Sequence, residues 1–186
     1  GLIKVFIKAE DYEKALSLFG QLCEKAEVRN YGYLIETHLS FIGDSKNLTL
    51  AESFFDKIIN DEMPYKIILQ VSTVNSFLQN IWKAQNDFDH VYRIWEKAVK
   101  FYGNTVNPGI LSSLNNTFFT IFFENYINDN INGFRKLQEI ITFYSGVKKI
   151  DEPFFNVMLT RASIWHERSI IDFIDKNYTL YHIPRT

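Results

Sequence analysis

Apolar side chains along this chain recur three or four residues apart, which is the spacing that places them on one face of an α-helix. Such a stripe covers only one face, so each helix must pack against a partner. The clearest stripe is Tyr31, Leu34, Ile35, His38, Leu39 and Ile42. We therefore predict amphipathic helices that come in packed sets.

A second kind of stripe occurs with the same spacing at two distant places. The two copies are Tyr12, Ala15, Leu16, Phe19, Leu22 and Cys23, and then Phe88, Val91, Tyr92, Trp95, Ala98 and Val99. Further copies begin near Leu48, Ile131 and Ile170. We expect five helices of this kind, and we expect Thr49 and Glu52 to form a capping box at the start of the helix near Leu48.

The helix that precedes each of these stripes starts with a related stretch of five residues. YGYLI, VNSFL, NNTFF and FNVML begin at residues 31, 74, 115 and 155, so the intervals are 43, 41 and 40 residues. A helix–turn–helix period of this length is typical of an α-solenoid. We predict an all-α fold, a single α-solenoid segment with repeats at 1–30, 31–70, 71–111, 112–151 and 152–186.

The composition agrees with a folded helical chain. Seventeen Phe, ten Tyr and three Trp supply large core side chains, and we expect Phe19, Phe55, Trp95 and Phe118 to be buried. A single cysteine, Cys23, excludes an intramolecular disulfide, and we expect it to be buried on a helix. No run approaches the roughly 18 apolar residues of a membrane span.

The chain starts inside a helical pattern without an N-cap. We therefore expect it to be a segment of a longer protein, with any targeting sequence in the part that is missing.

These units resemble the pentatricopeptide repeat family, in particular its divergent fungal mitochondrial members. The family unit has a first helix that begins Tyr-Asn-X-Leu-Ile and ends in lysine, then a turn, then Glu-Ala-X-X-Leu-Phe. Residues 2–19 match that pattern with Leu2-Ile3, Lys8 and the stretch 14–19. The related tetratricopeptide family has a similar architecture, but its Trp, Leu-Gly and Pro signature is not found at the corresponding places.

The resemblance implies that single-stranded RNA lies along the first helices, with one early polar side chain per repeat facing one base. Asparagine suits this task because its amide carries both donors and an acceptor. The candidates are Asn75, Asn116 and Asn156. Asn116 paired with Asp151 at the end of the same repeat implies a uridine preference.

Basic residues at the ends of first helices occupy the place that, in the family, approaches the phosphate backbone. Lys8 and Lys83 fill it, but Glu124 and Ile164 stand at the later places. Arg161 on the last first helix is a further candidate. With two or three phosphate contacts, we expect modest, salt-dependent affinity.

Each candidate also has a purely structural interpretation. An asparagine in the first turn of a helix often caps it or is solvated, and Asp151 before Pro153 suits a helix start. Lys8 and Lys83 favour the C-terminal end of the helix dipole whether or not RNA is present.

No grouping of residues indicates catalysis, a metal or a cofactor. His166-Glu167 superficially resembles a zinc protease motif, but Ile170 stands where its second histidine would be. We predict a binding protein rather than an enzyme, with RNA and not DNA as its ligand and with protein partners left open. The resemblance implies the mitochondrial matrix and a role in RNA stability, processing or translation. The alternative is a protein-binding helical scaffold, which the net charge of −2 would suit.

Overall fold

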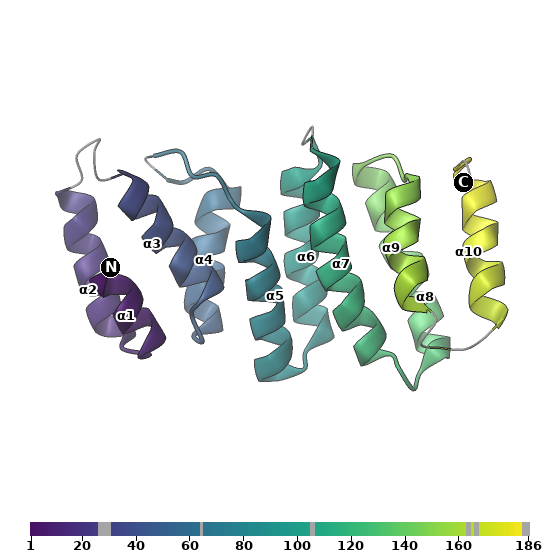
Figure 1. The fold of residues 1–186 in the computed structure, drawn as a ribbon, viewed down its shortest axis with the longest axis horizontal. Helices are drawn as coiled ribbons and strands as arrows, with labels where there is room; N and C mark the ends of the chain where they lie inside the picture. The colour runs from purple at the N-terminus through teal and green to yellow at the C-terminus, as the bar shows by residue number, and fades with distance from the viewer. Residues whose placement is uncertain (26–30, 64, 105–106, 163–164, 166–167, 184–186) are drawn as a thin grey trace. The chain divides into compact units, whose positions relative to one another are not determined.

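The computed structural model describes residues 1–25, 31–63, 65–104, 107–162, 165 and 168–183. Within these ranges the chain forms ten α-helices and no strand, which confirms the all-α prediction (Figure 1). The chain divides into two compact units, residues 1–85 and 86–186.

Unit 1 contains the first five helices and unit 2 the other five. The bounds in unit 1 are α1 (Leu2–Lys8), α2 (Tyr12–Glu24), α3 (Tyr31–Gly43), α4 (Leu48–Ile59) and α5 (Val71–Gln85). Those in unit 2 are α6 (Phe88–Tyr102), α7 (Pro108–Asn125), α8 (Asn130–Val147), α9 (Glu152–Ala162) and α10 (Arg168–Leu180). The predicted first helices correspond to the odd-numbered ones and the second helices to the even-numbered ones. The division into five repeats stays a prediction.

Short polar side chains start most of the second helices. The carboxylates of Asp11, Asp87 and Asp129 each accept a hydrogen bond from a backbone N–H in the first turn of the helix that follows. Asn47 does the same for α4, with its Oδ1 atom 3.1 Å from the Leu50 nitrogen. The capping box predicted at Thr49 was therefore wrong, because the N-cap is Asn47, two residues earlier.

Three helix ends close in the same way. After α1, α4 and α10, the residues Glu10, Asp61 and His182 adopt positive φ angles of 62°, 54° and 54°. In each case two backbone N–H groups bond back to carbonyls of the last turn. This is the Schellman arrangement, which usually employs glycine. It satisfies carbonyl groups in the last turn of each of these three helices.

In unit 1, α3 packs against its neighbours on both sides, α1 and α2 before it and α4 and α5 after it. The rings of Phe41 and Phe54 stack with centroids 4.4 Å apart, and Phe19 meets both edge-on. His38 is fully buried beside them, with Nε2 3.0 Å from the Phe54 carbonyl oxygen. A carbonyl only accepts, so Nε2 carries the proton of the neutral ring.

In unit 2, a buried aromatic ladder joins α6, α7, α8 and α9. Trp95 stacks on Phe118 at 4.2 Å, and Tyr144 stacks on Phe154 at 4.2 Å. The Trp95 indole N–H donates to Asn115 Oδ1 at 3.0 Å, and both residues are buried. Burial raises the pKa of Tyr144 to about 12, and the nearby Asp151 carboxylate acts in the same direction, while a hydrogen bond with Asn115 opposes them.

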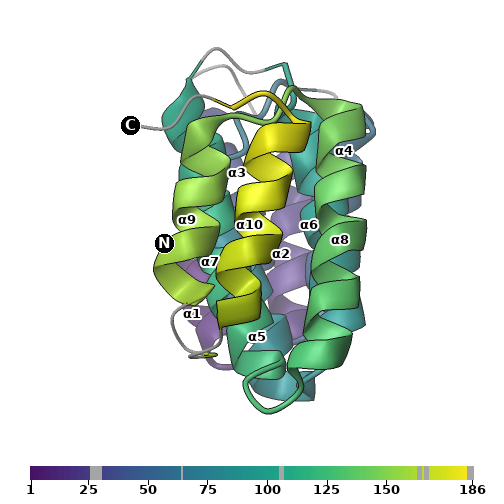
Figure 2. The same cartoon turned by 90° about the vertical axis from the view of Figure 1, so that its right-hand side faces the viewer.

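In the C-terminal part of unit 2, Trp165 packs against residues of α7 and α8. Its indole N–H donates to the Tyr126 carbonyl at 2.8 Å, and its ring packs on Phe123 and Phe134. A Cβ on Gly133 would lie 2.6 Å from this ring, so glycine is required there. Figure 2 looks onto α10, which packs against α9 at the end of this unit.

Several sequence predictions about the core differ from the structure, and Leu16 and Tyr31 of the predicted stripes are exposed. The four aromatic side chains predicted to be core are buried, as expected. Cys23 lies on α2 but is exposed. Ile131, predicted to start the α8 stripe, is 72% exposed, and the buried face of α8 is formed by Gly133, Leu137, Ile140, Ile141 and Tyr144.

Replacing Asn115 tests the hydrogen bond inside the ladder. Asn115→Ala leaves the buried indole N–H without its acceptor, so we expect a loss of about 1–3 kcal/mol in the free energy of unfolding. Urea unfolding followed by circular dichroism measures it. Gln138→Ala, which removes an exposed side-chain amide on α8, is the control and should change stability by less than about 0.5 kcal/mol. Equal effects of the two variants would contradict this role for Asn115.

The buried His38 makes stability depend on pH. Burial lowers the pKa of His38 to about 4, opposed by its hydrogen bond to the Phe54 carbonyl. In the unfolded chain the pKa is about 6.5, so the unfolded state binds a proton first. This contribution is complete above about pH 6.5 and is lost as the pH falls towards about 4, with a slope approaching about 1.4 kcal/mol per pH unit.

His38→Gln removes this titration and keeps a side-chain donor for the Phe54 carbonyl. The difference in unfolding free energy between pH 7 and pH 5 should therefore be smaller in the variant than in the parent chain. If the unfolding free energy fell equally in the two proteins between pH 7 and pH 5, His38 would not be the group responsible for the pH dependence.

Candidate nucleic-acid interface

Exposed positions recur at matching places on α7 and α9. On α7 they are Ser113, Asn116, Thr120 and Glu124, and on α9 they include Pro153, Asn156 and Thr160. The first three positions of α7 lie 40 residues before the three named on α9. The two helices pack directly against each other. The two helices thus expose side chains in the same register, and these are polar in both at the Asn116/Asn156 and Thr120/Thr160 places.

The two asparagines have the same local backbone environment. Thr120 Oγ1 donates to the Asn116 carbonyl at 2.7 Å, and Thr160 Oγ1 donates to the Asn156 carbonyl at 2.8 Å. Thr37 in α3 and Thr179 in α10 make the same contact four residues back, so it is a general feature of threonine in these helices.

None of the three candidate asparagines caps a helix. α7 begins at Pro108 and is capped by Asn107, so Asn116 lies more than two turns inside it. Asn75 and Asn156 lie about one turn inside α5 and α9. The capping interpretation of these residues was wrong, and the solvated interpretation stays open for the two exposed ones.

Asn116 has a charged partner from the next first helix. Arg161 Nη2 on α9 donates to Asn116 Oδ1 on α7 at 3.0 Å. The structure therefore brings together two of the residues that the sequence analysis selected for separate tasks, one for a base and one for a phosphate.

Asn156 has weaker neighbours. Its Nδ2 lies 3.5 Å from Glu152 Oε1, and the Tyr178 hydroxyl lies 3.5 Å from its Oδ1. Both distances are at the long limit of a hydrogen bond. The amide of Asn156 is therefore held less firmly than that of Asn116.

Asp151 caps α9. Its Oδ1 accepts from the Phe154 N–H at 3.1 Å, which is the structural role that the sequence left open. In the part of the chain that the structure describes, no hydrogen bond joins Asp151 to Asn116, its predicted reading partner.

In unit 1 the candidate asparagine is less exposed than the two in unit 2, whereas the candidate lysines are more exposed than Arg161 in unit 2. Asn75 is half-buried on α5, whereas Lys8 and Lys83 are exposed at the ends of α1 and α5. The orientation of α5 against α3 is fixed by Asn80, whose Nδ2 donates to the Gly43 carbonyl at 3.0 Å.

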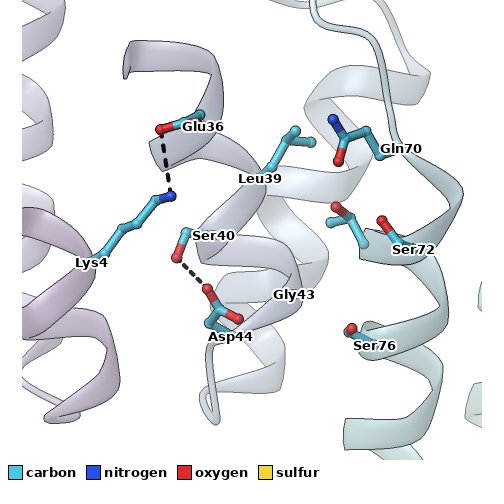
Figure 3. Close-up of a pocket in the computed structure, with 10 residues that line it drawn as sticks. Lys4, Glu36, Leu39, Ser40, Gly43, Asp44, Gln70, Ser72 and Ser76 are labelled. Atoms are coloured by element: carbon cyan, nitrogen blue, oxygen red, sulfur yellow. Dashed lines mark hydrogen bonds and ion pairs between the residues drawn. The ribbon is translucent and has the colours of Figure 1, made fainter. Parts of the chain in front are cut away.

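A polar pocket of about 270 Å³ opens among α1, α3 and α5 (Figure 3). Across it Lys4 and Glu36 form an ion pair at 3.5 Å, and Ser40 donates to Asp44 at 2.6 Å. The rest of the lining is Leu39, Gly43, Gln70, Ser72, Thr73 and Ser76. Sequence reasoning missed this pocket, although the small hydroxyl residues one turn apart on α5 were a usable signal.

Two other classes of function find no support in the described residues. None of their helices combines the length and apolar character needed to cross a bilayer. Within the same residues no three His, Cys, Asp or Glu side chains gather as metal ligands. Ile164 and the pair His166-Glu167, considered from the sequence, lie outside the described part.

Comparison with known proteins gives one family over almost the whole chain. Residues 1–184 match the family described as the RMD9 middle domain. The chain is 56% identical over 186 residues to "RNA-binding protein RMD9-like, mitochondrial" of Saccharomyces cerevisiae, covering 100% of this chain and 25% of that protein.

Two further relatives carry the name "RNA-binding protein RMD9, mitochondrial". Identity is 50% over 188 residues with that of Kluyveromyces lactis and 39% over 187 residues with that of Eremothecium gossypii. Each match covers 100% of this chain and 28% of the relative. The chain thus spans about a quarter of the length of these curated relatives.

Proposed function

Because the chain belongs to the RMD9 family, we propose that it binds single-stranded RNA as a segment of a mitochondrial protein. The observation that carries this proposal is the printed function of relatives that align with its full length. The names of these relatives describe RNA binding and no catalysis. A role in RNA stability, processing or translation stays a prediction from the resemblance.

The proposed binding face of each unit is the one formed by its odd-numbered helices. In unit 2 it carries Asn116 and Asn156, exposed at matching places on two packed helices. In unit 1 it carries the polar pocket, with Lys8 and Lys83 exposed on flanking helices. We propose that the helix pairs within each unit are stacked repeats of the pentatricopeptide α-solenoid type.

The chemistry of this face suits splayed bases. An exposed amide can address the Watson–Crick edge of an unpaired base, and hydroxyl groups with carboxylates can accept from its amino groups. Most aromatic side chains are buried in the cores and are not available as stacking platforms. Recognition would therefore rest on hydrogen bonds more than on stacking.

Electrostatics would contribute modestly. The net charge is −2, and Glu36, Asp44 and Glu124 lie on the proposed face. A protein-binding scaffold of the tetratricopeptide type, or a DNA-binding protein, would be the conclusion if single-stranded RNA failed to bind while a protein or DNA ligand did.

Removing the two exposed lysines tests the proposed face. We expect Lys8→Ala with Lys83→Ala to weaken binding of single-stranded RNA and to lower the slope of log affinity against log salt by about 0.7 per lysine. The matched control is Lys25→Ala with Lys176→Ala, because these exposed lysines lie at the end of α2 and on α10. Salt-titrated fluorescence anisotropy measures both, and equal slopes in the two double variants would contradict this location.

The base-reading assignment is tested at Asn116 and Asp151 together. Because Asp151 caps α9, we choose Asp151→Ser, which keeps a capping oxygen, combined with Asn116→Ala. The double variant should lose about fivefold in affinity, the size of one hydrogen bond, for RNA that carries the preferred base at one position. Its response to base changes at the other positions should be nearly that of the parent chain. Competition binding with oligonucleotides that differ at single positions measures this, and a uniform loss would remove the assignment.

A further inference from the structure

The bond between Arg161 and Asn116 decides how the Asn116 amide is turned. The donor is a guanidinium nitrogen, and arginine has five N–H donors and no acceptor. The amide atom that faces it at 3.0 Å must therefore be oxygen, not nitrogen. The Nδ2 group of Asn116, with its two N–H donors, is left for other partners.

A second donor at the same oxygen is disfavoured. Oδ1 has another lone pair, but an incoming N–H would bring positive charge next to the guanidinium. To a ligand, Asn116 therefore acts mainly as a donor, although a free asparagine can turn either end towards it. The exposed position of Asn116 makes the N–H groups accessible.

Arg161 is held in place rather than extended into solvent. The residue is half-buried, and its Nε atom is shielded from solvent without a hydrogen-bond partner among the described residues. The bond to Asn116 is itself exposed, and it is charge-assisted because its donor is a guanidinium nitrogen.

We propose that Arg161 is a positioning residue which fixes Asn116 as a donor and so makes one RNA position favour keto bases, uracil and guanine, over amino bases, cytosine and adenine. Uracil O4 and guanine O6 accept from an N–H, whereas the amino groups of cytosine and adenine present a donor at that place. This inference rests on the proposed function. It differs from the phosphate contact predicted for Arg161 from the sequence.

Asn156 is the internal comparison. It occupies the matching place on α9, but its contacts with the Glu152 carboxylate and the Tyr178 hydroxyl are both 3.5 Å long. Contacts of this length hold the amide less firmly than the 3.0 Å bond from Arg161 holds that of Asn116. The position read by Asn156 should discriminate less between keto and amino bases.

Selection from a random pool of single-stranded RNA, sequenced before and after binding, tests the inference. Asn116→Ala first identifies the RNA position that Asn116 reads, because the preference there disappears. Two variants of Arg161 are then compared with the parent chain. Arg161→Lys keeps a residue that only donates, whereas Arg161→Gln provides both a donor and an acceptor.

We expect the parent chain and Arg161→Lys to favour uracil over cytosine at that position. Arg161→Gln should lower the ratio of the two affinities by about fivefold, mainly through better binding of cytosine. The slope of affinity against salt should be unchanged. Arg135→Gln, an exposed arginine on α8, is the charge-matched control and should leave the ratio intact. Circular dichroism checks that all variants are folded.

Several results would overturn the inference. A uniform loss of affinity in Arg161→Gln, with a salt slope lower by about 0.7, would make Arg161 a phosphate contact. Three results would each contradict the positioning role of Arg161. They are a preference for uracil that is retained in Arg161→Gln, one that is lost in Arg161→Lys, and the absence of any keto preference in the parent chain. Failure of the parent chain to bind any RNA would instead contradict the proposed function.

Discussion

The hydrogen bond from the Trp95 indole to the Asn115 side chain fixes the rotation of α7 in unit 2. Both groups are buried, so turning the helix would leave a donor and an acceptor without partners in the core. Neighbouring residues on an α-helix are about 100° apart. With Asn115 held inward, Asn116 is exposed beside α9, where Arg161 reaches it. The interior of the unit thus sets the chemistry of its surface.

In unit 1, different contacts fix how the helices pack against one another. The buried His38 bonds to the Phe54 carbonyl, and the stacked Phe41 and Phe54 rings join α3 to α4. Asn80 bonds to the Gly43 carbonyl and fixes α5 on α3. The polar pocket among α1, α3 and α5 is the space that these contacts leave between helices. In each unit a buried polar group fixes how the helices pack. The packing in turn determines which polar side chains are exposed.

Much of the fold could be predicted from the sequence, because amphipathic spacing reports which side chains face the core. The helix pairs and the buried aromatic residues were found in this way. Helix starts were less predictable: the cap at Asn47 competed with a plausible one at Thr49, and α7 begins eight residues before Asn116. The site was predicted as separate residues. The bond between Arg161 and Asn116 joins positions 45 residues apart, and no local pattern indicates such a contact.

The central claim, that RNA lies on the odd-numbered helices, is tested most directly by photo-crosslinking the chain to single-stranded RNA that contains 4-thiouridine. Mass spectrometry then identifies the crosslinked peptides. The account predicts crosslinks on α1, α3, α5, α7 and α9, with those on α7 close to Asn116. Crosslinks confined to α2, α4, α6, α8 and α10 would contradict it.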